Sequence, residues 1–242
     1  MKISKRLKTI SNLLDDNINV IDVGCDHALL DIYLFNNKKN INIIASDVKQ
    51  GPLEQAKKNI EKYGCSNIKV KLGNGIDTIE NDTDTIVIAG MGGDTIIEIL
   101  DNGKDKLDNI KSMVISPQSE WYKARKFIVS LGFYIIDEVI IEEKDKYYLI
   151  IKFAKGNIKY SKKELEYGPI LLKNKSKEFI KYYELVLEDK KKILKKVPIY
   201  KIGTRINTRK QINNLKKILK NGWFCVMHFL FLCICFKQLQ LL

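Results

Sequence analysis

Four segments decide the fold of this 242-residue chain: VIDVGCDHALL (20–30), IIASDVKQGPLEQA (43–56), VKLGNGID (70–77) and TIVIAGMGG (85–93). Each begins with an apolar run that predicts a buried strand and then enters a loop of glycine and polar residues. Because the carboxyl ends of parallel strands meet at one edge of a sheet, we expect these loops to line one small-molecule pocket.

Strand-like and helix-like runs alternate from residue 19 to about 154, which predicts an α/β fold with a parallel sheet covered on both faces. The last two strands lie in EVIIEEKDKYYLIIKF (138–153), where a short polar turn predicts a hairpin and hence one antiparallel strand. A seventh strand in a terminal hairpin is typical of Rossmann-like class I methyltransferases. Dinucleotide dehydrogenases normally continue with parallel units instead.

The loop after the first strand predicts S-adenosylmethionine rather than a dinucleotide. Gly24 permits close approach of a ligand, but the later glycines of a GxGxxG motif are missing. Asp22 and Asp26 would repel a pyrophosphate and attract an α-ammonium group. Asp26 is also consistent with a plain helix N-cap, an alternative that the sequence leaves open.

The other three loops supply the remaining candidate cofactor residues. Asp47 ends the second strand, where a carboxylate can accept both ribose hydroxyls, although the same geometry also binds NAD. Gly73 and Asn74 follow the third strand and suit contacts to adenine, or a simple Asn-Gly turn. The small residues after the fourth strand leave room for a methyl acceptor; this loop contains Ala89, Gly90, Met91 and Gly92.

Charge is unevenly distributed along the chain. Residues 1–154 hold 21 Lys and Arg against 23 Asp and Glu, whereas residues 155–242 hold 21 against 6. A basic excess confined to one region favours a nucleic-acid partner, because each neutralised phosphate releases counterions. Nucleotide bias in a Lys-rich genome is the alternative explanation.

Three regions are expected along the chain. Residues 1–154 form the methyltransferase-like domain, and 155–221 form a basic, coiled-coil-like helical hairpin, with helices near 170–196 and 205–220. Residues 222–242 form an atypical apolar tail that either packs on the hairpin or comes from a non-native reading frame. Its uncharged run is short of the roughly 20 residues that span a bilayer, so we expect no membrane contact and disfavour an anchor.

The N-terminus lacks the apolar run of a secretory signal, which predicts a cytoplasmic protein. The five cysteines and two histidines show no ligand spacing, so we expect neither a disulfide framework nor a metal site. We further expect a monomer.

The segments SKRL, VGCDHALL, ASDVKQGPLEQAK, GNGID, IAGMGG, GKDKL, SPQ and GFYIIDEVIIEEKDKYY resemble, in order and spacing, the bacterial tRNA (adenine-22-N1)-methyltransferases. The resemblance covers residues 3 to about 153 closely and the hairpin loosely. It implies methyl transfer from S-adenosylmethionine to N1 of an adenine in the D-loop region of tRNA. The family usually has Glu in place of Asp47, Asp in place of Asn74, and Gln-Pro-Asn in place of residues 116–118.

On this interpretation Asp26 and His27 lie beside the transferring methyl as catalytic residues, and the tRNA meets both the pocket mouth and the hairpin. The expected substrate-binding residues are Arg6, Pro117, Gln118, Lys191 and Lys195. Two other functions fit the sequence: a non-catalytic RNA-binding module, and a methyltransferase acting on a non-RNA substrate. A dehydrogenase is disfavoured by the missing glycines and the terminal hairpin.

Overall fold

The structure is a computed structural model that describes residues 3–238, with side chains up to residue 220. The chain divides into two compact units, Met1–Leu171 and Leu172–Leu242.

The first unit is built on one seven-stranded sheet with the order β3-β2-β1-β4-β5-β7-β6. Strands β1 to β5 pair in parallel, and β7 pairs antiparallel with both β5 and β6. The strands are β1 (Asn19–Val23), β2 (Asn42–Asp47), β3 (Ile68–Leu72), β4 (Thr85–Ala89), β5 (Ser112–Ser116), β6 (Phe133–Glu143) and β7 (Lys146–Lys155). The predicted fold class and its terminal hairpin are confirmed.

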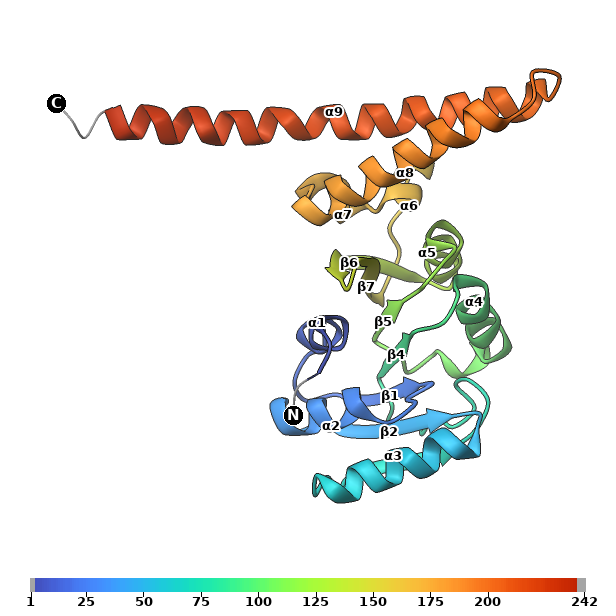
Figure 1. The fold of residues 1–242 in the computed structure, drawn as a ribbon. Coiled ribbons are helices and arrows are strands. Elements are labelled where there is room, and N and C mark those ends of the chain that lie inside the picture. Colours follow the sequence, from blue (N-terminus) through green and yellow to red (C-terminus); the bar gives the residue numbers. More distant parts are fainter. Residues whose placement is uncertain (1–2, 239–242) are drawn as a thin grey trace. The chain divides into compact units, whose positions relative to one another are not determined.

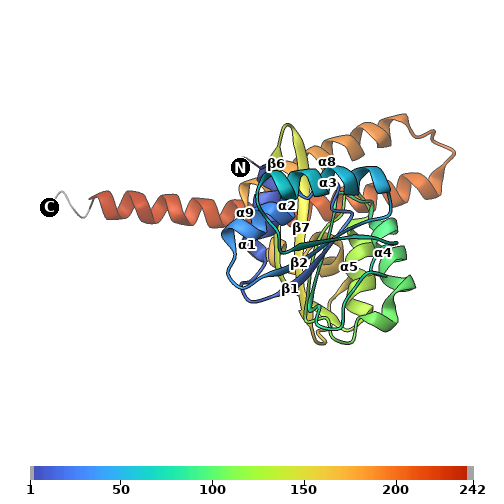
Figure 2. The same cartoon turned by 90° about the horizontal axis from the view of Figure 1, so that it is seen from below.

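Helices cover both faces of this sheet. Figures 1 and 2 show α1 (Lys5–Leu13) and α2 (Leu29–Asn37) on one side, together with α3 (Gln50–Lys62). The opposite side carries α4 (Gly93–Asn102) and α5 (Trp121–Ser130), and a short 3₁₀ turn, Lys104–Lys106, follows α4. The arrangement leaves the carboxyl ends of β1 to β5 open to build a site.

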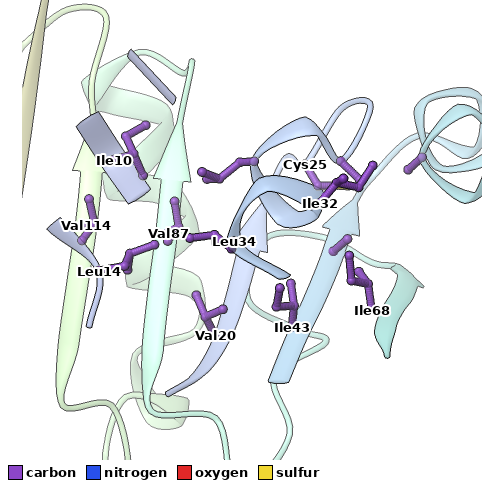
Figure 3. Packing of buried hydrophobic residues seen from close by; sticks show 14 of the residues in the cluster. Ile10, Leu14, Val20, Cys25, Ile32, Leu34, Ile43, Ile68, Val87 and Val114 are labelled. Carbon is purple, nitrogen blue, oxygen red and sulfur yellow. The ribbon is translucent and has the colours of Figure 1, made fainter. Parts of the chain in front are cut away.

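The core on the α1–α3 side forms from alternate strand residues, because successive side chains of a strand point to opposite faces. Figure 3 shows Ile10 and Leu14 beside Val87 and Val114 in this cluster. Leu34 of α2 reaches the same layer, and each of these five side chains is at least 98% buried. The layer fixes α1 and α2 against the strands that carry the pocket loops.

Helix α1 begins at two sets of side-chain hydrogen bonds. Ser4 Oγ accepts from the Leu7 N–H at 3.2 Å and so caps the N-terminus of the helix. The carboxylate of Glu143, at the end of β6, accepts from the backbone N–H groups of Lys5 and Arg6 at 2.7 and 3.3 Å. The donors of the first turn are therefore satisfied partly from the far end of the unit.

A buried ion pair extends the first unit beyond residue 154, where composition suggested a boundary. Arg125 Nε donates to Glu138 Oε1 at 2.6 Å, and both side chains are fully buried. Glu138 Oε2 also accepts from the Ile170 N–H at 3.2 Å, and Arg125 donates to the Leu165 carbonyl at 3.3 Å. These bonds hold α6 (Lys162–Tyr167) and the start of α7 (Pro169–Asn174) in the first unit.

The second unit contains a hairpin of α8 (Lys177–Lys196) and α9 (Ile202–Gln238), as predicted. Among the described side chains, the buried apolar residues of the pair are Phe179, Tyr183, Leu187, Ile212, Leu215, Ile218 and Leu219. A single helix over 170–196 was wrong, because Lys175 has a left-handed φ of 42° and Ser176 starts a new helix by accepting from the Phe179 N–H.

The expected apolar tail, 222–242, begins within α9, whose helical backbone reaches Gln238. Its side chains and its last four residues lie outside the described part of the chain. Within the described residues, no helix is both long enough and apolar enough to cross a bilayer.

Candidate functional site

Two adjoining cavities lie at the carboxyl edge of the sheet, where the four predicted loops meet. The first, of about 330 Å³, is lined by residues of α1 and of the loops after β1, β4 and β5. The second, of about 220 Å³, is lined by the ends of β2 and β3 and by α4. They share Gly24, Asp47 and Met91, so together they form one elongated site.

Gly24 keeps the centre of this site open. Its N–H and that of Cys25 both donate to the Ser46 carbonyl, at 2.8 and 3.0 Å, which turns the chain sharply. Gly24 has a φ of 76°, and a Cβ built on it would lie 2.3 Å from Met91 Cε. A side chain here would fill the site and strain the backbone, so this position requires glycine.

The loop that holds Asp26 and His27 adopts unusual backbone angles. Asp26 and Ala28 have φ values of 52° and 54°, which is uncommon for residues other than glycine. Helix α2 therefore starts at Leu29, and Ala28 occupies its N-cap position. The N-cap alternative for Asp26 is wrong. Strained, exposed polar residues of this kind cluster at functional sites.

The two candidate catalytic side chains lie close together at the first cavity. Asp26 Oδ1 is 3.6 Å from His27 Nε2, and the side chains are 71% and 49% exposed. The His27 carbonyl accepts from Asn59 Nδ2 of α3 at 2.9 Å, which fixes the loop. Asp26 is thus free to meet an incoming group from solvent.

Two buried carboxyl groups lie beneath this loop. Burial raises the pKa of Asp22 to about 7, although nearby Arg6 lowers it and Asp47 raises it further. Burial and then the charge of Asp22 raise the pKa of Asp31 well above its usual range. Neither side-chain oxygen of Asp31 has a hydrogen-bond partner. The sequence analysis missed Asp31, because it reads as one polar residue in a short helix.

Asp31 makes the fold less stable as pH rises. Above pH 4 the unfolded chain loses this proton while the folded chain keeps it, so the free energy of unfolding falls until the raised pKa is passed. We expect Asp31→Leu to increase the free energy of unfolding at pH 7 by about 2 kcal/mol, and much less at pH 4. Urea titrations at both pH values measure this. Asp31→Asn, which removes the titration but leaves a buried amide, should raise the free energy of unfolding less than Asp31→Leu does. If Asp31→Leu raised the free energy of unfolding equally at both pH values, the explanation would be contradicted.

Asp47 lies at the junction of the two cavities, with Gly73 and Asn74 in the second. Its Oδ1 accepts from the Lys49 N–H at 2.9 Å, which orients the carboxylate. One wall of the second cavity consists of Ile76, Thr95 and Ile99. Ile76 belongs to the predicted loop after β3, but sequence reasoning missed Thr95 and Ile99, because both lie on α4, which shows only an ordinary amphipathic pattern.

The loop after β4 borders the first cavity through Ala89, Gly90 and Met91. Gly90 has a φ of 82°, and a Cβ on it would point towards Arg6 at 3.6 Å. Gln118 also lines this cavity, and its N–H donates to the Met91 carbonyl at 2.8 Å.

Two other expected residues have different surroundings. Gly92 occupies the N-cap position of α4 and lines neither cavity. Pro117 is buried, also outside both linings, and its carbonyl accepts from the Trp121 indole N–H at 3.0 Å.

Arg6 places a cation at the mouth of the first cavity. Its guanidinium lies 5.2 Å from the centroid of the Tyr148 ring, a cation–π contact that holds the side chain between β7 and the glycine loop. On the second unit, Lys195 is exposed in the last turn of α8, and Lys191 pairs with Glu188 at 2.6 Å. Among the described residues, no three His, Cys, Asp or Glu side chains gather as metal ligands.

Comparisons with known proteins agree with this geometry. The family model described as tRNA (adenine(22)-N(1))-methyltransferase matches residues 20–221. The Bacillus subtilis protein of that name is 34% identical over 206 residues, covering 81% of this chain and 86% of its own. The structure of Streptococcus pneumoniae Sp1610 in complex with S-adenosyl-L-methionine has a TM-score of 0.82 and 32% identity, over 90% of this chain and 100% of that one.

A further solved structure, that of M. capricolum TrmK in complex with S-adenosyl-homocysteine, has a TM-score of 0.81. It is 30% identical, and the match covers 91% of this chain and 99% of that one. Together with the family model and the Bacillus subtilis relative, these matches show that the chain belongs to the tRNA (adenine(22)-N(1))-methyltransferase family.

Proposed function

We propose that this protein transfers a methyl group from S-adenosylmethionine to N1 of adenine 22 in tRNA. Family membership carries the proposal, and the two-part cavity at the carboxyl edge of the sheet agrees with it. S-Adenosylmethionine supplies an electrophilic methyl group carried on a sulfonium centre.

The residues at the site fit this cofactor. Asp22 offers a carboxylate to the α-ammonium group at the base of the first cavity. Asp47 lies where the ribose hydroxyls would meet its carboxylate, and Asn74 suits the adenine in the second cavity. The left-handed Gly24 leaves a cradle that any side chain would fill.

The acceptor side follows from the chemistry of adenine. N1 carries its lone pair on the base-pairing edge, so the adenine must be unpaired when it enters the first cavity. Because N1 attacks without losing a proton, no strong general base is needed, and orientation supplies most of the rate. We assign Asp26 to stabilise the positive charge that grows on the base, and His27 to shape the opening beside it.

Contacts to the rest of the tRNA come from both units. Arg6 and Gln118 lie at the cavity mouth, where the guanidinium suits a phosphate or the acceptor nucleotide. Pro117 would contribute through its backbone and the placement of Gln118. Lys191 and Lys195 of the hairpin would contact phosphates without sequence preference.

The proposal is tested by methyl transfer from labelled S-adenosylmethionine to unmodified tRNA with adenine at position 22, and to the same tRNA with guanine there. We expect label only in the first, mapped to N1. Label in both tRNAs would show that the target nucleotide is not adenine 22. Absence of label from a chain that binds tRNA would favour the non-catalytic alternative.

Asp22 should make cofactor binding depend on pH. Its carboxyl must be ionised to pair with the α-ammonium group, and its pKa in the free protein is raised to about 7. The affinity for S-adenosylmethionine should therefore fall as pH drops below 7, approaching tenfold per pH unit. Calorimetry between pH 5.5 and 7.5 measures the profile. 5′-Methylthioadenosine, which lacks the ammonium group, and Asp22→Asn should each give a flat profile; a sloping profile for either would contradict the assignment.

A further inference from the structure

The turn between α8 and α9 exposes an apolar surface that the hairpin does not use. We name residues 193–206 the hairpin tip; Figure 1 shows the turn at the end of the pair. Ile199 is 83% and Tyr200 79% exposed, and Ile193, Ile202 and Ile206 are also exposed. Single apolar residues on a surface are ordinary, but these five within the hairpin tip indicate a surface that contacts a partner.

The charge around the tip identifies the chemistry of that partner. Residues 190–210 contain nine Lys and Arg and no Asp or Glu. A phosphate backbone complements such a surface. A tyrosine beside a lysine, here Tyr200 beside Lys201, can stack on the face of an unpaired base. The tip thus combines the two contacts that single-stranded nucleic acid uses, namely backbone charge and base stacking.

The tip is also held in one conformation before any partner arrives. Arg205 Nη1 donates to the carbonyls of Leu194 and Val197, at 3.3 and 2.5 Å, and so satisfies the last turn of α8. The Lys201 N–H donates to the Pro198 carbonyl at 3.1 Å, which closes the turn that presents Tyr200. A preformed surface loses little conformational entropy on binding.

We propose that the hairpin tip binds unpaired bases of the tRNA, with Tyr200 stacking on a base and Ile199 packing beside it. This inference rests on the proposed function, because that function makes tRNA the substrate. It adds base contacts in a loop of the tRNA to the phosphate contacts already assigned to the lysines. Lys195, Lys196 and Lys201 supply the surrounding charge.

The test compares two kinds of variant by their salt dependence. Tyr200→Ala should weaken binding of unmodified tRNA about tenfold, because one stacked base is lost, and leave the slope of log K against log salt unchanged. A Lys195→Gln/Lys196→Gln variant should instead reduce that slope by about 2. Tyr200→Phe should bind like wild type, and Tyr200→Leu should behave like the alanine variant.

A matched control and a second RNA make the test specific. Tyr63 is an exposed tyrosine of the first unit with a lysine, Lys62, 5.8 Å from its ring centroid, so Tyr63→Ala removes a similar side chain elsewhere. It should leave tRNA binding unchanged. A blunt RNA duplex without unpaired bases should bind wild type and Tyr200→Ala equally.

The proposal is overturned if Tyr200→Ala binds tRNA as wild type does, or if it weakens the duplex to the same extent. It is also overturned if sedimentation shows self-association that the substitution abolishes, or if wild type binds anionic phosphatidylserine vesicles through Tyr200. Methyl transfer by the wild-type chain to adenine 22 is measured separately, so the proposed function can stand while the tip proposal fails.

Discussion

Arg125→Met should lower the free energy of unfolding of the first unit by about 3–5 kcal/mol. The substitution leaves the fully buried Glu138 carboxylate without its cation, 2.6 Å from where the guanidinium stood. Burial already raises the pKa of Glu138 against the opposing effect of Arg125, so the lost pairing would raise it further. The folded protein would then hold Glu138 in its neutral form, or in its ionised form at a large cost in stability.

Urea titration measures this loss in a Trp223→Phe background, where Trp121, on the same helix as Arg125, is the single tryptophan. A companion Arg125→Met/Glu138→Leu variant removes both charges and should recover most of the stability. The Ile170 N–H would still lack its acceptor, so recovery should be incomplete. If Arg125→Met were no less stable than Arg125→Met/Glu138→Leu, the ion pair would not be what holds this part of the unit together.

Asp47→Ala should raise the dissociation constant for S-adenosylmethionine by about 100-fold or more. We assign this carboxylate to two ribose hydroxyls, and hydrogen bonds to a charged group contribute about 1.5–3 kcal/mol each. Asp47→Glu, which introduces the residue that family members usually carry here, should stay within about tenfold of wild type. Calorimetry of the three proteins measures the series.

Asp77→Ala provides the matched control for this series, because Asp77 lines the same cavity but pairs with Lys106 at 2.7 Å. It removes the same charge and should change cofactor affinity little. The tRNA affinity of both alanine variants should equal that of wild type. If Asp77→Ala weakened the cofactor as much as Asp47→Ala, the effect would come from general charge rather than from ribose recognition.

The strands of the first unit could be predicted closely because apolar β-branched runs and glycine turns are local signals. Strands β1 to β4 overlap the apolar starts of the four segments, and the β6–β7 hairpin follows from its polar turn. The break of the 170–196 helix was missed although Ser176 is a recognisable cap. The Ser161–Glu164 capping box that starts α6 is equally local, but it lies outside both helices that the sequence predicted for this region.

The loops of the candidate site could be predicted in order, but not the geometry within them. The left-handed angles at Asp26 and Ala28 flank His27, whose carbonyl accepts a hydrogen bond from Asn59 on another helix. Arg125 and Glu138 are only 13 residues apart, on the consecutive elements α5 and β6, but nothing in the sequence indicates that these two side chains pair. Such contacts join segments that only the complete tertiary structure brings together.

The attachment of α1 to β6 has a consequence for the order of folding during synthesis. Arg6 leaves the ribosome early, but Glu143, which bonds the first turn of α1, is made 137 residues later. Lys152, which binds Asp15 at 2.6 Å, comes later still. At about 5–20 residues per second this interval is roughly 7–27 seconds. The nascent chain thus carries its glycine loops well before it can secure the helix that brings Arg6 to them.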